Sequence, residues 1–155
     1  MKYTSLLLGL FALLTASVRA DQDIAISELP APVAKAIEAR FPGQTPLAAE
    51  KETKVDTVVY EVKIRHEEKA YEVTATPDGV IHRVHPIKKE NRIPVSELPV
   101  AVVDGLKKRF PDGVLLSAEK ERSLFLGYFE VKVRAGLFVY DVDIKADGKI
   151  TKVEE

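Results

Sequence analysis

The sequence of 155 residues contains no cysteine and no tryptophan. Without cysteine the chain can form no disulfide bond, no thiolate metal site and no cysteine nucleophile. An excess of charge of one sign is also missing, because 23 basic and 24 acidic residues give a net charge of −1. Composition therefore provides no electrostatic basis for nucleic-acid binding. Hydrophobic residues make up 46% and charged residues 30%, which is typical of a globular domain.

Motifs for catalysis and for cofactors are absent as well. The sequence has no Gly-x-Ser-x-Gly nucleophile motif, no phosphate-binding glycine loop and no zinc signature. His82 and His85 lie three positions apart on a predicted strand, so their side chains are expected on opposite faces and form a poor pair of metal ligands. We therefore predict a protein without catalytic residues, metal site or cofactor.

Residues 1–20 have the pattern of a signal peptide. Lys2 gives a positive start, an apolar run covers residues 6–14, and Val18-Arg19-Ala20 ends with small or aliphatic residues at the positions that a signal peptidase reads. A membrane anchor is the weaker alternative, because the run is shorter than the roughly 20 residues that span a bilayer. We predict cleavage after Ala20 and a mature protein in the periplasm or secreted, away from the membrane.

Most of the remaining chain consists of an internal sequence repeat of two similar units. Residues 27–86 align without a gap with residues 96–155, at an offset of 69 positions (96 minus 27). Both copies contain Ser-Glu-Leu-Pro, Arg-Phe-Pro, Ala-Glu-Lys-Glu and Glu-Val-Lys in the same order. Self-similarity of this kind predicts two copies of one structural unit. The predicted divisions are a signal peptide at 1–20, a first repeat at 21–86, a polar linker at 87–94 and a second repeat at 95–155.

Each repeat begins with the pattern of a helix. Ser27 can cap backbone amides, and Pro30 is tolerated in a first helical turn. Leu29, Val33, Ile37 and Phe41 recur every four residues, which predicts one apolar stripe. The proline and glycine that follow Phe41 end the helix.

After the helix the period of the apolar residues changes to two, which indicates strands. In the first repeat strands are predicted near residues 47–51, 58–64 and 71–76, and a hairpin turn at Asp78-Gly79 leads to a fourth at 80–84. The second repeat has the same pattern. The predicted fold class is therefore α+β, a tandem repeat of one helix and a four-stranded antiparallel sheet, with the helices on one face and the other face free.

The two repeats differ most in the turn after their first strand. Residues 53–57 of the first repeat are Thr-Lys-Val-Asp-Thr, whereas residues 123–128 of the second are Ser-Leu-Phe-Leu-Gly-Tyr. Exposed apolar clusters often mark interaction sites. The alternative is that this tip packs on the first repeat or in a homodimer. Alternation places Tyr128 on the helix-free face with charged neighbours, and aromatic anchors concentrate interface energy. The predicted partner-binding residues are Leu124, Phe125, Tyr128, Glu130 and Lys132.

The order of these motifs resembles the PepSY-like family of exported bacterial proteins, which is also described as β-lactamase-inhibitor-like. The shared motifs are Leu-Pro-x-x-Val, a helix ending in Phe-Pro, Ala-Glu-Lys-Glu, Tyr/Phe-Glu-Val-Lys, Tyr-x-Val and Asp-Gly-x-Ile, and they cover both repeats. The resemblance implies tandem units whose open sheet and hairpin tips grip a protein partner, such as an exported peptidase. Because cysteine and tryptophan are missing, the disulfides and part of the aromatic surface of β-lactamase inhibitor protein are missing too, which argues against inhibition of β-lactamase itself.

These observations lead to one functional hypothesis and one alternative. We expect an exported, non-enzymatic protein that binds another exported protein through its open sheet face and hairpin tip. The alternative is a module that binds a small molecule or acts in envelope stress.

Overall fold

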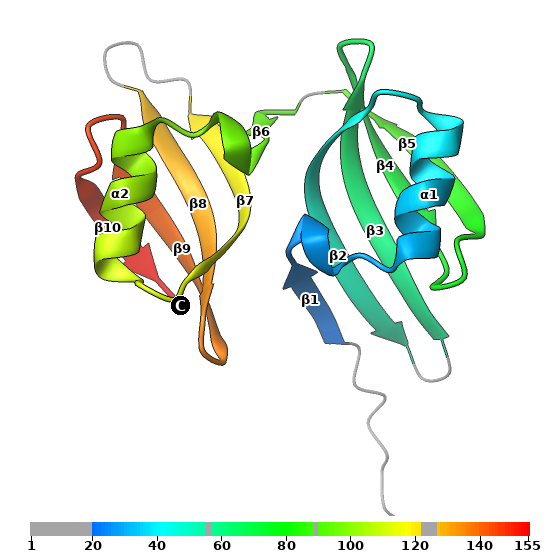
Figure 1. The fold of residues 1–155 in the computed structure, drawn as a ribbon, viewed down its shortest axis with the longest axis horizontal. Helices are drawn as coiled ribbons and strands as arrows, with labels where there is room; N and C mark the ends of the chain where they lie inside the picture. The colour runs from blue at the N-terminus through cyan, green and yellow to red at the C-terminus, as the bar shows by residue number, and fades with distance from the viewer. Residues whose placement is uncertain (1–19, 55–56, 89, 122–126) are drawn as a thin grey trace, which may run out of the picture.

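The computed structural model describes residues 20–54, 57–88, 90–121 and 127–155 (Figure 1). The described residues form two α-helices and two antiparallel sheets of five strands each. The protein is therefore a mixed helix-and-sheet structure, as the sequence predicts.

The first unit is a helix packed on a meander of strands. Its elements are β1 (Ala20–Ile24), the 3-10 turn η1 (Ile26–Glu28), α1 (Ala31–Arg40), β2 (Thr45–Lys54), β3 (Thr57–His66), β4 (Lys69–Ala75) and β5 (Ile81–Ile87). The strands lie in the order β1-β2-β3-β4-β5. Each strand after the helix is thus hydrogen-bonded to the one that precedes it in the chain.

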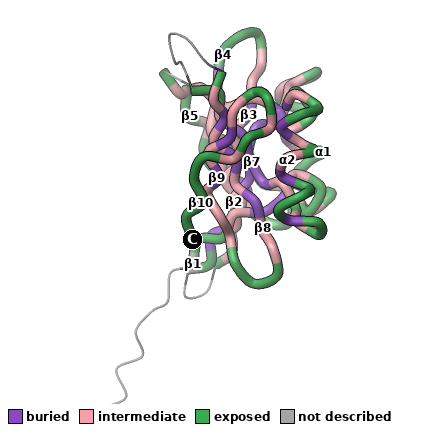
Figure 2. The backbone as a smooth tube through the Cα atoms, turned by 90° about the vertical axis from the view of Figure 1, so that its left-hand side faces the viewer, coloured by how far each residue is buried: buried purple, intermediate pink, exposed green. Residues whose placement is uncertain are grey.

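The second unit has the same order of elements. These are β6 (Arg92–Ile93), the 3-10 turn η2 (Val95–Glu97), α2 (Val100–Arg109), β7 (Val114–Glu121), β8 (Tyr128–Ala135), β9 (Phe138–Lys145) and β10 (Ile150–Glu154). The strands lie in the order β6-β7-β8-β9-β10. Both helices lie on one side of the molecule, so the helix-free faces of both sheets lie on the other side (Figures 1 and 2).

Each unit has its own apolar core between its helix and its sheet. In the first unit the helical stripe buries Val33 and Ile37 against Val62, Ile64 and Val73. The equivalent core of the second unit contains Val102, Leu106, Val131, Val133 and Val142. Burying one such side chain fully contributes roughly 1.5–3 kcal/mol. The apolar periodicity that predicts the helices and strands is therefore the pattern of these two cores.

The prediction of four strands per unit is wrong, because each sheet has a fifth strand that precedes the helix. β1 pairs with the second half of β2, from Ala49 to Thr53. β6 has only two residues and pairs with Ala118 and Glu119 of β7. β1 lies at the boundary between the predicted signal peptide and the predicted first repeat, and β6 lies in the predicted linker at 87–94. Edge strands are held mainly by backbone hydrogen bonds, so a short edge strand can form without an alternation of apolar and polar residues.

The predicted cap at Ser27 is also not observed. The Ser-Glu-Leu-Pro segment forms the 3-10 turn η1, and α1 begins only at Ala31 after Pro30, without a side-chain cap. Glu28 provides a hydrogen-bond acceptor at the start of the turn instead, since its carboxylate accepts a hydrogen bond of 2.8 Å from the N–H of Ala25. The motif therefore encodes a turn followed by a helix rather than one capped helix.

The two units pack together through a matching bulge in each. The pairing of β2 with β3 skips Leu47, and the pairing of β7 with β8 skips Leu116, 69 positions later. Both leucines are buried, at 1% and 2% exposure, yet neither belongs to the core cluster of its own unit. Both line one groove where β2 meets β7. Because a bulge re-aims a side chain, each leucine is directed into the junction between the units.

Ion pairs reinforce this junction. The Arg134 guanidinium donates hydrogen bonds of 2.7 and 3.1 Å to the two carboxylate oxygens of Glu28 in η1. The bond from Arg134 first, and then the bond from the N–H of Ala25, hold the pKa of Glu28 below its ordinary value. Lys132 of β8 also lies 3.6 Å from Asp23 of β1. A bidentate arginine–carboxylate pair fixes geometry as well as distance, so the two sheets are held in one orientation.

We predict that the junction leucines stabilise the whole molecule. Leu47→Ala or Leu116→Ala should lower the free energy of unfolding by about 2–5 kcal/mol, because each removes a buried side chain and leaves a cavity. The measurement is urea unfolding followed by circular dichroism. The matched control is Leu137→Ala, at a side chain that is 96% exposed, where the change should stay within about 0.5 kcal/mol. Equal effects at Leu47 and Leu137 would contradict a packed junction.

Candidate functional site

The candidate site is the helix-free face of the second sheet, centred on β8. Along this strand Phe129, Val131 and Val133 are buried in the core. Tyr128, Glu130 and Lys132 alternate with them and are partly exposed. The alternation therefore places three of the five predicted partner-binding residues together on the helix-free face. Leu124 and Phe125 lie outside the described residues, so their role stays a prediction.

Tyr128 begins β8 and lies opposite Lys145 of β9. The Lys145 ammonium is 5.7 Å from the centre of the Tyr128 ring. A cation above an aromatic ring is attracted to the ring by about 0.5–1 kcal/mol at an exposed site. This contact orients the Tyr128 ring at the start of β8.

Glu130 occupies the middle of the face among other acids. It lies between Glu119 of β7 and Asp143 of β9 in the pairing of the strands. Burial raises the pKa of Glu130, and the negative charges of Glu119 and Asp141 raise it further. The ionised form of Glu130 is therefore destabilised in the folded protein, and a positively charged group of a partner would stabilise it.

The first unit repeats this arrangement at Glu61, which is 69 positions earlier. Burial raises the pKa of Glu61, and Glu72 and Glu52 add to the rise, while Arg83 opposes it. The Arg83 guanidinium lies 3.0 Å from Glu61 and 3.1 Å from Glu72. The helix-free faces of both units therefore carry a central glutamate surrounded by other carboxylates, with a compensating arginine in the first unit.

Lys132 contributes to the junction as well as to the face. Its ammonium lies 3.2 Å from Asp141 on the neighbouring strand and 3.6 Å from Asp23 of the first unit. Burial lowers the pKa of Lys132, but the hydrogen bond from Lys132 to Asp141 and the charges of Asp23 and Asp141 outweigh burial, so the pKa is raised. Lys132 is thus held by partners within the chain, and only its remaining exposed part is open to another molecule.

Sequence reasoning missed a second apolar tip on the same unit. Leu137 in the turn between β8 and β9 is 96% exposed, and Phe138, the first residue of β9, is 50% exposed. The equivalent turn of the first unit holds Glu68 and Lys69 instead. The sequence contains this information. The comparison of the repeats that points to Leu124 and Phe125 also shows that Leu137 and Phe138 stand where the first repeat has charged residues.

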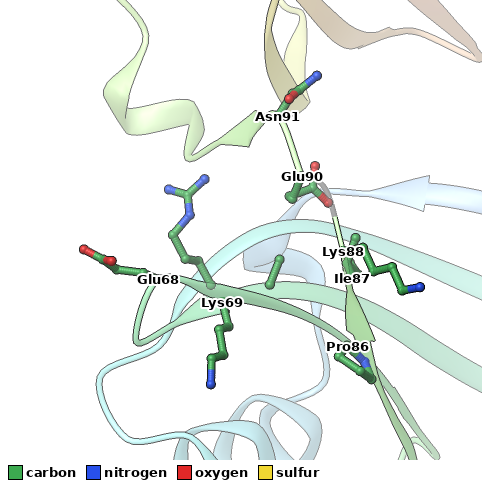
Figure 3. A pocket seen from close by; sticks show the side chains of 9 residues that line it. Glu68, Lys69, Pro86, Ile87, Lys88, Glu90 and Asn91 are labelled. Carbon is green, nitrogen blue, oxygen red and sulfur yellow. The ribbon is translucent and has the colours of Figure 1, made fainter.

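The hollow with charged walls beside the connection between the units has a volume of about 560 Å³. Glu68 and Lys69 lie on one side of it, and Glu90 and Asn91 on the other (Figure 3). Arg65 also lines this hollow, and its guanidinium donates a hydrogen bond to the carbonyl of Arg92. The walls carry both charges and no nucleophile beside a base, so they suggest no reaction.

Within the described ranges, no group of histidine, aspartate and glutamate side chains has the arrangement of a metal site. In the same residues, neither helix is long and apolar enough to cross a membrane.

Comparisons with known proteins give only distant likenesses. No protein-family model matches the sequence, and no curated protein matches it. Among solved structures, a BLIP-like protein from Bacteroides fragilis is 16% identical, with a TM-score of 0.36, over 79% of this chain and 83% of that one. A protein from Bacteroides thetaiotaomicron, described as calcium-regulated and periplasmic, is 18% identical, with a TM-score of 0.36, over 87% and 97%.

A third structure, described as a periplasmic protein of the DUF2874 family from Bacteroides vulgatus, is 20% identical, with a TM-score of 0.36, over 87% of this chain and 97% of that one. TM-scores this low do not establish a common fold. Neither the fold nor the function of this chain is therefore inferred from these three structures.

We predict that Glu130→Gln stabilises the protein at pH 7. The folded state raises the pKa of Glu130, so the ionised carboxylate destabilises the folded state at every pH above that raised pKa. Glutamine removes this charge, and the gain should disappear as the pH falls through the raised pKa to the ordinary value of 4.5 and below. The measurement is the urea midpoint at pH 7 and at pH 4.

The control for this measurement is Glu155→Gln at the exposed last residue of the chain. It should leave the midpoint nearly unchanged at both pH values, because surface changes away from specific contacts have small effects. A loss of stability in Glu130→Gln at pH 7 would contradict the proposed repulsion.

Proposed function

We propose that the protein is exported and binds another exported protein through the helix-free faces of its two sheets and the apolar tips of its second unit. In this proposal it is not an enzyme, and it belongs among the PepSY-like proteins that the sequence motifs resemble. The periplasm or the extracellular medium is its place of action, in keeping with the signal-peptide pattern of residues 1–20.

The observation that carries the proposal is the exposure of Leu137 and Phe138. An apolar side chain exposed at the tip of a hairpin lacks the favourable free energy of burial, and the first unit has charged residues at the same positions. Burial against a partner would contribute about 25 cal/mol per Å² of apolar surface. The change from charged to apolar residues in one copy only is thus explained by a contact that the second unit makes and the first does not.

The sheet face beside these tips supports a protein as the partner. It carries Tyr128, whose ring contacts Lys145, and Glu130, whose ionised form is destabilised. It also carries charges of both signs, and all of these groups lie on hydrogen-bonded strands. Mixed charges select a partner by complementarity rather than by general attraction. A positively charged group of the partner is the best complement to Glu130 and its acidic neighbours. An exported peptidase is the class of partner that the family resemblance favours.

The test is capture of partners from an exported-protein extract by the purified protein, with identification by mass spectrometry. Phe125→Asp, Tyr128→Ala and Leu137→Asp should each lower the affinity for the captured protein by about ten-fold or more, because truncating an interface anchor commonly costs more than about 1.4 kcal/mol. The matched control is Val100→Asp on α2, at a side chain that is 76% exposed on the helix side, and it should bind normally.

Two results would contradict the proposal. Unchanged capture by all three variants would remove the proposed surface. Loss of a monomer–dimer equilibrium in the same variants, measured by sedimentation without any other protein, would show that the apolar tips bind a second copy of the chain instead.

A further inference from the structure

The outer edge of the second sheet is an uncovered strand. β10 forms the edge of this sheet that lies away from the first unit (Figure 1). One side of β10 pairs with β9, and among the described residues no strand pairs with its other side. Four of its five residues are exposed. An unpaired edge presents backbone N–H and C=O groups to which another strand can bind.

The backbone of Val153 points to this free edge. Hydrogen bonds alternate in direction along β9, and the N–H of Lys145 donates one of 3.0 Å to the carbonyl of Lys149, on the side of β10. Odd-numbered residues of β9 therefore direct their backbone groups to β10, and even-numbered residues direct theirs to β8. Val153 lies opposite Val142, an even-numbered residue, so its own N–H and C=O point away from β9.

Opposite charges flank Val153 on the helix-free face. Lys152 lies opposite Asp143 of β9, and Glu154 lies opposite Asp141. The Lys152 ammonium is 2.8 Å from the Glu154 carboxylate, and both side chains are more than half exposed. Like charges that lie directly opposite each other on neighbouring strands are destabilising, so Glu154 would be stabilised by a second cation on its free side.

The sequence of β10 is self-complementary about Val153. If two copies of β10 pair antiparallel with Val153 at the centre, each Lys152 lies opposite a Glu154 of the other copy. The two Val153 residues would form a hydrogen-bonded pair, and the charged residues would form the pairs in which side chains lie closest. Charged residues on an edge strand often prevent pairing. Here a two-fold axis would convert them into two attractive pairs.

β5, the outer edge of the first sheet, lacks these features. Pro86 stands 69 positions before Glu155 and has no N–H, so it removes a donor that a further strand would need. His85 stands where the second unit has Glu154, so this edge has no acid beside Arg83. Arg83 is already bound to two glutamates of its own sheet. The self-complementary edge therefore occurs in the second unit only.

We propose that the protein forms a homodimer in which β10 pairs antiparallel with β10 of a second copy, about a two-fold axis at Val153. The second sheets of the two copies, with five strands each, would then join into one sheet, and their helix-free faces would lie on the same side. The pairing uses β10 and does not depend on the apolar tips. It can therefore fail without affecting the proposed binding of another protein, and the reverse also holds.

A charge exchange tests the pairing by sedimentation equilibrium of the purified protein alone. The wild type should dimerise reversibly. Lys152→Glu or Glu154→Lys should each raise the dissociation constant about ten-fold or more, because each places two like-charge pairs in the symmetric contact. A mixture of the two variants should dimerise again, since every pair then joins a glutamate to a lysine. The control is Lys35→Glu at an exposed residue of α1, which should dimerise like the wild type.

A single cysteine tests the register. Because the protein contains no cysteine, Val153→Cys introduces one thiol in each copy. In a hydrogen-bonded antiparallel pair the Cα atoms lie about 5.5 Å apart, which suits a disulfide bond. Mild oxidation of this variant should therefore give a cross-linked dimer. Val84→Cys, at the equivalent position of β5, should not cross-link under the same conditions.

Three results would overturn the proposal. The first is a wild-type protein that stays monomeric at about 1 mM, which would favour a strand of another protein as the occupant of the edge. The second is a dimer that neither charge variant weakens. The third is a mixture of the two variants that does not dimerise although circular dichroism shows both to be folded. A dimer that Leu137→Asp abolishes and Lys152→Glu does not would assign self-association to the apolar tips instead.

Discussion

Two bulged leucines, one from each unit, are buried at the junction that places the two sheets beside each other. Leu47 and Leu116 leave the cores of their own units and are buried where β2 meets β7. Two units of about 60 residues each are near the size at which a single core gives marginal stability, so a shared apolar junction matters to both. The pair between Arg134 and Glu28 then fixes the orientation. As a result both helices lie on one side and both helix-free faces on the other (Figure 2).

The proposed function depends on positions at which the two units differ. The shared residues are explained by turns, cores and strand pairing, which any copy needs in order to fold. Glu68 of the first unit corresponds to Leu137 of the second, so one hairpin tip carries a charged side chain and the other exposes an apolar one.

Much of the fold could be predicted from the sequence, because apolar periodicity reports burial directly. Val33 and Ile37 on the helix and the alternation along β8 are buried as the pattern predicts. The edge strands β1 and β6 could not be predicted, since backbone hydrogen bonds hold them and their side chains show no period. The sequence also gives no sign that Leu47 and Leu116 serve a junction, because a bulge changes the direction of a side chain without changing the composition of the strand.

The candidate site was predictable in part. The position of Tyr128, Glu130 and Lys132 on one face follows from a period of two. The engagement of Lys132 by Asp23 could not be foreseen, because it requires knowing how the two units meet. The exposed pair Leu137 and Phe138 could be found from the alignment of the repeats, but the strand pattern that includes Phe138 does not show that its side chain is half exposed.

The junction should hold both sheet faces in one fixed arrangement. The protein contains no cysteine, so Ala39→Cys on α1 and Lys108→Cys on α2 would introduce the only two thiols, at equivalent exposed positions. Spin labels at these sites report the distance between the helices by pulsed electron resonance. We expect one narrow distance distribution, which broadens when Leu47→Asp and Leu116→Asp are added. A broad distribution in the parent protein, or one that the two aspartates leave unchanged, would contradict it.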